Sequence, residues 1–178
     1  YAVERYLRLY EKLLGPYPFE KFAVVENFFP TGYGFPSWTL LGSSVVALPF
    51  ILDTSLGHEI AHSWWGNGVL VDPGGGNWSE GLTAYLSDHL FQEQRGEGAE
   101  YRQATLQKYA DYALRAKDFP LSAFHERHSP STEAVGYGKA LMLFHMTRRE
   151  LGDDVFVKGL RSLYAGKKFQ RVSFDDVR

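Results

Sequence analysis

The chain has 178 residues, 44% of them hydrophobic and 16% aromatic, which is enough for one compact domain and excludes a disordered or fibrous protein. Nineteen Lys and Arg against twenty-one Asp and Glu leave a net charge of −2, so no nucleic acid or anionic membrane is expected as the main partner. No apolar run is long enough for a transmembrane segment. The absence of cysteine leaves histidine, carboxylate, serine and tyrosine for any chemistry.

The first third of the chain is expected to form one helix and two strands. Apolar residues repeat with helical spacing over residues 6–14 and stop at a Gly-Pro pair, which predicts an amphipathic helix. Residues 22–25 and 45–48 are β-branched and aromatic runs, and they are interpreted as strands of one sheet. The Gly- and Pro-rich stretch 30–36 between them is interpreted as a structured loop.

From residue 53 onward the apolar pattern takes a helical period. A helix capped by Asp53 or Thr54 is expected to run through Trp64 and end near residues 66–68. An extended piece at 69–71, a Gly-rich turn at 72–76, helices around 79–90, 106–114, 139–146 and 156–164, and an irregular segment at 119–130 are predicted after it. The helix at 139–146 is apolar nearly all round, which predicts burial. Strands early and helices late indicate an α+β domain.

The motif His58-Glu-Ile-Ala-His62 lies inside the helix predicted from residue 53. Four residues advance a helix by about 400°, so both imidazoles lie on one face, one turn apart, where they can reach one metal ion. Glu59 is rotated by about 100° from His58, so it is placed to reach a water at that ion rather than to be a ligand. Neutral imidazoles are ordinary zinc ligands, and a catalytic zinc needs a third protein ligand and one open position.

Glu80 is the candidate for that third ligand. It begins the next predicted helix, after a Gly-rich turn that lets the chain fold back over the first helix. The residues alone leave an alternative open, because Asn77 or Ser79 can cap this helix and Glu80 is then the N3 carboxylate of a capping box on Asn77. Two buried histidines without partners are costly, so a metal is the more economical explanation of the motif.

The segments HEIAHSWWGN (58–67) and WSEGLTAY (78–85) resemble the zinc signature of the aminopeptidase N family, the gluzincin peptidases that also include leukotriene hydrolase. Residues 15–21 resemble the entry to the thermolysin-like catalytic domain of that family, and residues 137–140 resemble the segment that bears its catalytic tyrosine. The resemblance implies a thermolysin-like zincin domain, with a small N-terminal sheet and a mainly helical half. Residues 1–178 are therefore expected to be one metallopeptidase catalytic domain, a fragment of a longer enzyme with flanking domains.

The same resemblance implies a role for each candidate residue. His58, His62 and Glu80 are implied to bind one zinc ion per chain, Glu59 to act as general base, and Tyr137 to donate a hydrogen bond to the oxyanion. These roles agree with elementary chemistry, since a carboxylate can move a proton from water to the leaving amine and a phenol can stabilise a negative oxygen. From its spacing alone, Tyr137 also fits an ordinary tyrosine at the start of a helix.

The chain departs from the family pattern at two places. Seventeen residues rather than eighteen separate the second histidine from the glutamate, which places a deletion in the turn at 74–76. Family aminopeptidases carry a Gly-Ala-Met-Glu-Asn strand whose Glu holds the free amine of the substrate. The matching segment here is Gly32-Tyr-Gly-Phe-Pro36, with Phe35 at the position of that carboxylate. A weaker preference for a free N-terminus is expected unless another acid, such as Glu26, reaches the same spot.

The predicted function is a zinc-dependent metallopeptidase that hydrolyses a peptide substrate near its N-terminus, as an aminopeptidase-like enzyme. A zinc endopeptidase without strict N-terminal specificity and a peptide-binding module that retains zinc but has little turnover remain as alternatives. Residues 42–44 lack the Gly-x-Ser-x-Gly elbow, which argues against a serine hydrolase. His125 and His128 are interpreted as surface histidines, and His89 and His145 as histidines near the core.

Overall fold

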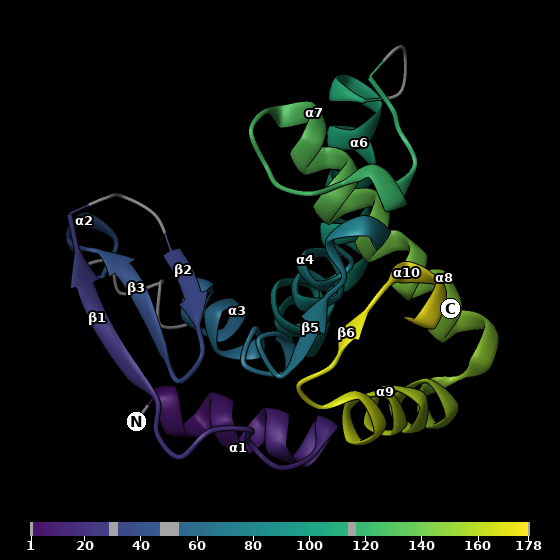
Figure 1. Cartoon of the computed structure of the whole chain (residues 1–178). Coiled ribbons are helices and arrows are strands. Elements are labelled where there is room, and N and C mark those ends of the chain that lie inside the picture. Colours follow the sequence, from purple (N-terminus) through teal and green to yellow (C-terminus); the bar gives the residue numbers. More distant parts are fainter. Residues whose placement is uncertain (1, 29–31, 47–53, 114–116, 178) are drawn as a thin grey trace.

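A computed structural model describes residues 2–28, 32–46, 54–113 and 117–177, and it places a small sheet beside a larger group of helices (Figure 1). The first elements are α1 (Ala2–Leu14), β1 (Ala23–Asn27), β2 (Gly32–Phe35), β3 (Trp38–Gly42), α2 (Ser43–Val46) and α3 (Ser55–Ala61). They are followed by β4 (Trp65–Gly66), β5 (Val69–Val71), a 3₁₀ turn at Pro73–Gly75, α4 (Ser79–Ala84), α5 (Leu90–Gln94) and α6 (Gly98–Tyr112).

The C-terminal part is helical apart from one short strand. It contains a 3₁₀ turn at Leu121–Ala123, α7 (Pro130–Glu133), α8 (Ala140–Leu151), α9 (Asp153–Lys167), β6 (Arg171–Val172) and α10 (Phe174–Val177). Single turns of π-helix at Tyr85–His89 and Ala134–Lys139 join α4 to α5 and α7 to α8. The α+β class predicted from the sequence is confirmed.

The amphipathic helix predicted at the start of the chain is confirmed as α1. Its buried residues are Tyr6, Tyr10 and Leu14. The hydroxyl group of Tyr10 lies 3.2 Å from the carbonyl oxygens of both Gly57 and Leu86. Since Gly57 belongs to α3 and Leu86 follows α4, α1 supports both helices that carry the histidine motif and Glu80.

The N-terminal sheet has the strand order β1-β3-β2, with β1 and β3 parallel and β2 and β3 antiparallel. β2 is therefore an edge strand, and it packs against α3. A Cβ atom at Gly32 would lie 2.6 Å from Oε1 of Glu59, and one at Gly34 would lie 3.0 Å from Cβ of His62. These glycines permit a close approach of strand and helix. The loop predicted at 30–36 is consequently wrong for residues 32–35, which form β2, while residues 30 and 31 lie outside the described residues.

The first predicted strand is confirmed as β1, whereas the strand predicted at 45–48 is wrong where the structure describes it. Residues 45 and 46 end the helix α2, and residues 47 and 48 lie outside the described residues. The centre of the sheet is β3 instead, which pairs with both neighbours. Strand formation depends on such non-local pairing more than on the β-branched composition of a segment.

The helix with the histidine motif ends earlier than predicted. Ala61 is the last residue of α3, and the chain turns through residues 62–64 into β4. β4, β5 and β6 form a second, parallel sheet in that order, so the extended piece predicted at 69–71 is confirmed as β5. In the Gly-rich turn, Oδ1 of Asp72 accepts a hydrogen bond of 3.0 Å from the amide of Gly74.

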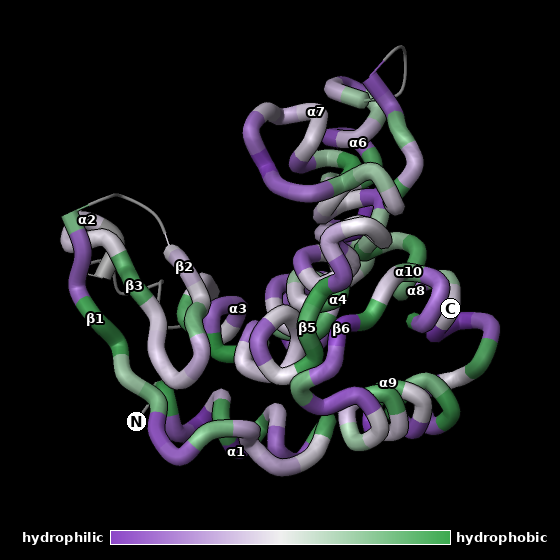
Figure 2. The backbone as a smooth tube through the Cα atoms, viewed as in Figure 1, coloured by the Kyte–Doolittle hydropathy of each residue, from purple (hydrophilic) through white to green (hydrophobic). Residues whose placement is uncertain are grey.

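The main core fills the space between α1, α3, α4, α8 and α9. Trp64, Trp65 and Trp78 are completely buried in it. Nε1 of Trp64 donates to the carbonyl oxygen of Gly15 (3.0 Å), and Nε1 of Trp78 donates to that of Val172 (2.7 Å). Figure 2 shows hydrophobic stretches along β3 and β5 and a hydrophilic loop before α7.

The helix predicted at 139–146 is confirmed as α8, but its burial is less complete than predicted. Leu141 and Phe144 are buried, whereas Leu143 is 38% exposed and Met146 is 57% exposed. α8 packs on α4 and α9, which leaves its other face open. Among the described residues, no helix combines the length and the hydropathy needed to cross a membrane.

Candidate metal centre and active site

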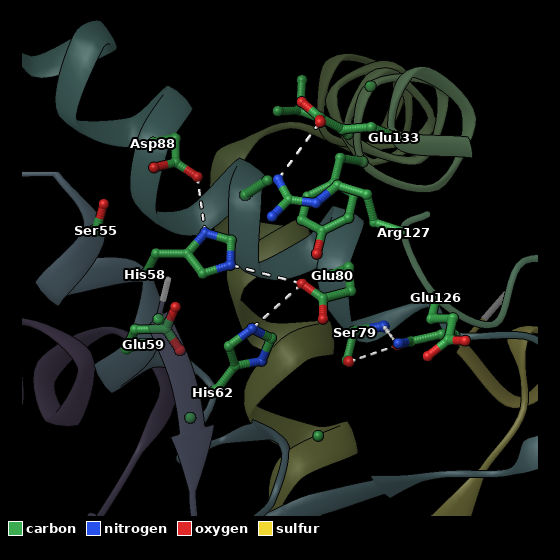
Figure 3. Close-up of a pocket in the computed structure, with 18 of the residues that line it drawn as sticks. Ser55, His58, Glu59, His62, Ser79, Glu80, Asp88, Glu126, Arg127 and Glu133 are labelled. Atoms are coloured by element: carbon green, nitrogen blue, oxygen red, sulfur yellow. Dashed lines mark hydrogen bonds and ion pairs between the residues drawn. The ribbon is translucent and has the colours of Figure 1, made fainter. Parts of the chain in front are cut away.

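A cleft of about 910 Å³ lies between the edge strand β2 on one side and α4, α6 and the π-turn of residues 134–139 on the other. All the site residues predicted from the sequence line this cleft: His58, Glu59, His62, Glu80 and Tyr137. They come from three separate parts of the chain. The fold therefore brings the whole predicted set together (Figure 3).

The two imidazoles and the Glu80 carboxylate converge on one point. Nε2 of His58 lies 3.6 Å and Nε2 of His62 lies 3.3 Å from Oε2 of Glu80. The potential ligand atoms of these three residues all lie within 4.8 Å of one another, and no other group of three metal-ligating side chains is found in the described part of the chain. The shortened turn before α4 thus still brings Glu80 to the histidines.

Second partners orient both imidazole rings. Nδ1 of His58 lies 2.8 Å from Oδ2 of Asp88, and Nδ1 of His62 lies 3.0 Å from the carbonyl oxygen of Trp65. A neutral ring that donates through Nδ1 leaves the Nε2 lone pair for a metal, and such partners are the usual support of zinc-binding histidines. Two imidazole nitrogens and one carboxylate oxygen are a catalytic zinc donor set, so the residues fit this ion.

Glu80 does not take part in the capping box that its spacing allows. Oδ1 of Asn77 accepts hydrogen bonds from the amide (3.2 Å) and the hydroxyl (2.7 Å) of Ser79. The amide of Asn77 donates to the carbonyl oxygen of Phe124 at 2.6 Å. The start of α4 is thus stabilised by Asn77, and the Glu80 side chain is directed at the imidazoles (Figure 3).

Charges around the centre favour an ionised Glu80. Burial alone would raise the pKa of Glu80, but the neighbouring imidazoles of His62 and His58 hold this pKa well below its usual value. Burial likewise works against a charged His58, but Asp88 and Glu80 outweigh it and raise the pKa of His58. The ionised carboxylate is the form that a metal ligand requires.

Glu59 lies beside the centre, against the glycines of β2. Burial raises the pKa of Glu59, while His62 and His58 act in the opposite direction. A carboxylate whose pKa is raised takes up a proton more readily, which suits a general base that later acts as an acid.

Tyr137 occupies the π-turn of residues 134–139, and π-turns are common at functional sites. Its ring is nearly parallel to the imidazole of His58, with ring centroids 6.3 Å apart and 16° between the planes. Burial and the nearby carboxylate of Glu80 raise the pKa of Tyr137. The phenol therefore stays protonated and is available as a hydrogen-bond donor in the cleft.

The remaining candidates lie outside this arrangement. Phe35 stacks on Trp38, with centroids 4.4 Å apart, and neither Phe35 nor Glu26 is among the residues that line the cleft. His125 and His128 are exposed, as predicted, although His125 lies at the cleft.

Each histidine near the core has a protein partner, but Nδ1 of His89 has none in the described part of the chain, so the prediction of satisfied histidines holds only in part. Nε2 of His89 lies 2.8 Å from Nη1 of Arg102, and Nδ1 of His145 lies 3.2 Å from the hydroxyl of Tyr85. His89 is fully buried.

Asp88 and Arg127 also line the cleft, and neither was predicted from the sequence to belong to the site. Asp88 lies eight residues after Glu80, and the π-turn at Tyr85–His89 changes the direction in which this part of the helix presents its side chains. A zinc-binding histidine generally needs a second hydrogen-bond partner, and this requirement was the one feature that pointed to a residue such as Asp88. Arg127 lies in a predicted irregular segment with no motif.

Comparison with known proteins agrees with this geometry. A family model described as "Peptidase family M1 domain" matches residues 52–178. Aminopeptidase RNPEPL1 of Mus musculus is 34% identical over 101 residues, which cover 53% of this chain and 14% of that protein. Aminopeptidase 2, mitochondrial, of Saccharomyces cerevisiae is 26% identical over 191 residues, which cover 96% of this chain and 20% of that protein.

A solved structure shares the fold. The crystal structure of an M1 zinc metallopeptidase from Deinococcus radiodurans superposes with a TM-score of 0.76 and 25% identity, over 98% of this chain and 38% of that chain. The chain thus spans only 14% and 20% of the length of the two curated relatives. The resemblance to the aminopeptidase N family is confirmed, and because the family model matches more than half of the sequence, the chain belongs to peptidase family M1.

Proposed function

We propose that the full-length protein is a zinc-dependent metallopeptidase with aminopeptidase-like activity, and that residues 1–178 are its catalytic domain. The observation that carries this proposal is the convergence of His58, His62 and Glu80 in a cleft that also holds Glu59 and Tyr137. Membership of family M1 and the names of the relatives support peptide hydrolysis as the reaction. The small share of each relative that the chain covers supports further flanking domains.

In this mechanism, His58 and His62 would hold one zinc ion through Nε2, and Glu80 through its carboxylate. When bound, zinc supplies a Lewis acid that acidifies a water and polarises the peptide carbonyl group. Glu59 accepts the proton of the attacking water and passes it to the leaving amine. The phenol of Tyr137 donates a hydrogen bond to the carbonyl oxygen as its negative charge develops.

The test is peptide turnover together with metal content in the full-length protein. Chelation is expected to abolish turnover, and added zinc is expected to restore it. Glu59→Gln should retain zinc but lower turnover by at least about 10²-fold, because the amide keeps the shape and cannot accept the proton. Glu150→Gln, at an exposed position on α8, is the matched control and should leave turnover unchanged. A full-length protein that binds zinc and peptides but hydrolyses none would favour the peptide-binding alternative.

A zinc endopeptidase without strict N-terminal specificity is the second candidate, and the position of Phe35 favours it. Phe35 packs on Trp38, and Glu26 is exposed on β1 away from the cleft lining, so neither residue supplies an acid for a substrate ammonium group. The deciding measurement is kcat/KM for matched peptides with free and acetylated N-termini. A ratio above about 10³ in favour of the free amine would require an acidic anchor, and a ratio near one would support the endopeptidase.

A further inference from the structure

Arg127 places a cation in the cleft beside the candidate catalytic tyrosine. It lies in the loop before α7, and both Arg127 and Tyr137 line the cleft. Cζ of Arg127 is 5.7 Å from the centroid of the Tyr137 ring. In Figure 3 the guanidinium group is joined to Glu133 by a dashed line, whereas the side chain of Glu126 lies on the side of the loop near Ser79.

The charge of Arg127 is only partly compensated by its neighbours. Nη1 of Arg127 lies 3.4 Å from Oε2 of Glu133, and this is the one hydrogen bond that the described part of the chain gives it. The other carboxylate oxygen of Glu133 is held closely by Nζ of Lys108. One carboxylate is thus shared by two cations. The Arg127 side chain is 51% exposed, and a guanidinium has five N–H donors, so most of them remain available to a ligand.

We propose that Arg127 binds a carboxylate group of the peptide substrate and thereby favours short peptides. This proposal rests on the proposed function, because the phenol of Tyr137 marks where the oxygen of the scissile carbonyl lies. An extended residue spans about 3.3 to 3.6 Å. Cζ of Arg127 is 5.7 Å from the centroid of the Tyr137 ring, so the guanidinium is close enough to this ring for a carboxylate that lies one or two residues beyond the scissile bond.

The chemistry of the groups agrees with this assignment. A guanidinium binds a carboxylate through two parallel N–H groups, which a lysine cannot reproduce. The cleft lining is rich in acids, which repel a substrate carboxylate, whereas Arg127 and Lys108 are the lysine and arginine residues of the lining that attract it. An acidic side chain next to the scissile bond also carries a carboxylate. The experiment therefore has to separate a C-terminal carboxylate from a side-chain carboxylate.

The experiment measures peptide binding by calorimetry in the full-length protein carrying Glu59→Gln, so that hydrolysis does not consume the ligand. Three matched tripeptides are compared: one with a free C-terminal acid, one with a C-terminal amide, and one amide with aspartate as its last residue. The acid is expected to bind about fivefold to tenfold more tightly than the plain amide, as for a half-exposed ion pair. Tight binding of the aspartate amide would identify side-chain carboxylates as a second source.

Adding Arg127→Gln is expected to remove the preference for the acid while the affinity for the plain amide stays the same. Arg149→Gln, at an exposed position on α8, is the matched control and should retain the preference. The proposal is overturned if acid and amide bind equally before the substitution, if Arg127→Gln weakens both equally, or if only Lys108→Gln removes the preference. Since the readout is binding, a protein that shows this preference but hydrolyses no peptide would contradict the proposed function and not the role of Arg127.

Discussion

Two pairs of histidines lie close together in this protein, and they differ in the charges around them. The ring centroids of His58 and His62 are 5.0 Å apart, and those of His89 and His145 are 5.5 Å apart. The spacing of the rings therefore does not distinguish the pairs. The first pair faces the carboxylates of Glu80 and Asp88, and the second lies beside the guanidinium groups of Arg102 and Arg148.

The acidic and basic neighbours shift the pKa values of the two histidine pairs in opposite directions. At His58 the nearby acids outweigh burial and raise the pKa. At His89 burial acts together with Arg102 and lowers the pKa to about 4, although Glu93 acts in the opposite direction. Arg102 also occupies Nε2 of His89. Acidic neighbours thus make a histidine pair a candidate metal site, whereas arginines keep a similar pair neutral and structural.

The largest difference between the two histidine pairs is expected in the effect on kcat of substituting the tyrosine beside each pair. Tyr137→Phe should lower kcat for peptide hydrolysis by about 10²- to 10³-fold, because the hydrogen bond that we propose to the developing oxyanion would be lost. Tyr85 stacks on His89 at 4.8 Å, so Tyr85→Phe is the matched control and should leave kcat unchanged. Steady-state kinetics of the full-length protein provide the measurement, and equal kcat in both variants would reduce Tyr137 to a packing role.

A smaller effect, on zinc affinity, is expected when the carboxylate that orients His58 is replaced. Asp88→Asn should weaken zinc affinity by about 10- to 100-fold, since the amide supports the imidazole less strongly. Competition with a chromogenic chelator measures this affinity. Asp153, which is paired with Arg148 near the second pair, provides the control Asp153→Asn. A zinc affinity that is unchanged in Asp88→Asn would mean that this contact does not support the metal.

The smallest effect concerns the pH dependence of stability at the second pair. Because the pKa of His89 is about 4 in the folded chain and 6.5 without the fold, the unfolded chain takes up a proton first as the pH falls. The free energy of unfolding should therefore be largest above pH 6.5 and be lower by about 2 kcal/mol near pH 5.

His89→Gln should remove this contribution, which denaturant titrations between pH 7.5 and roughly 5 can measure as the difference between the two proteins. His125→Gln, at an exposed position, is the matched control. If the two proteins lose stability in parallel as the pH falls, His89 is not the group responsible.

The histidine motif was predictable from the sequence because its geometry is local. Four residues on a helix place two side chains on one face, whatever the rest of the chain does. The helix α1 was predictable for the same reason. For Glu80 the residues alone left metal ligation and a helix cap as alternatives, and the roles of Glu80 and Tyr137 rested on the resemblance to a family, since no spacing rule relates residues in separate helices.

The parts that were not predicted depend on contacts between distant segments. Gly32 and Gly34 allow β2 to lie against Glu59, and residues 32–35 form a strand there. In the sequence, these two glycines are equally typical of a loop. Asp88 reaches His58 through a π-turn, which the 3.6-residue period does not describe. Arg127 belongs to the cleft because its loop packs beside Tyr137, which is ten positions away.

The zinc content of the full-length protein tests the central claim most directly, by comparing Glu80→Ala with Glu93→Ala. Each variant removes a carboxylate near one histidine pair, and Glu93 is paired with Arg148. We expect one zinc ion per chain in the unchanged protein and in Glu93→Ala, and none in Glu80→Ala at nanomolar metal. Loss of a helix cap alone would cost about 1 kcal/mol of stability and no zinc. Full zinc content in Glu80→Ala would contradict the assignment of the metal centre.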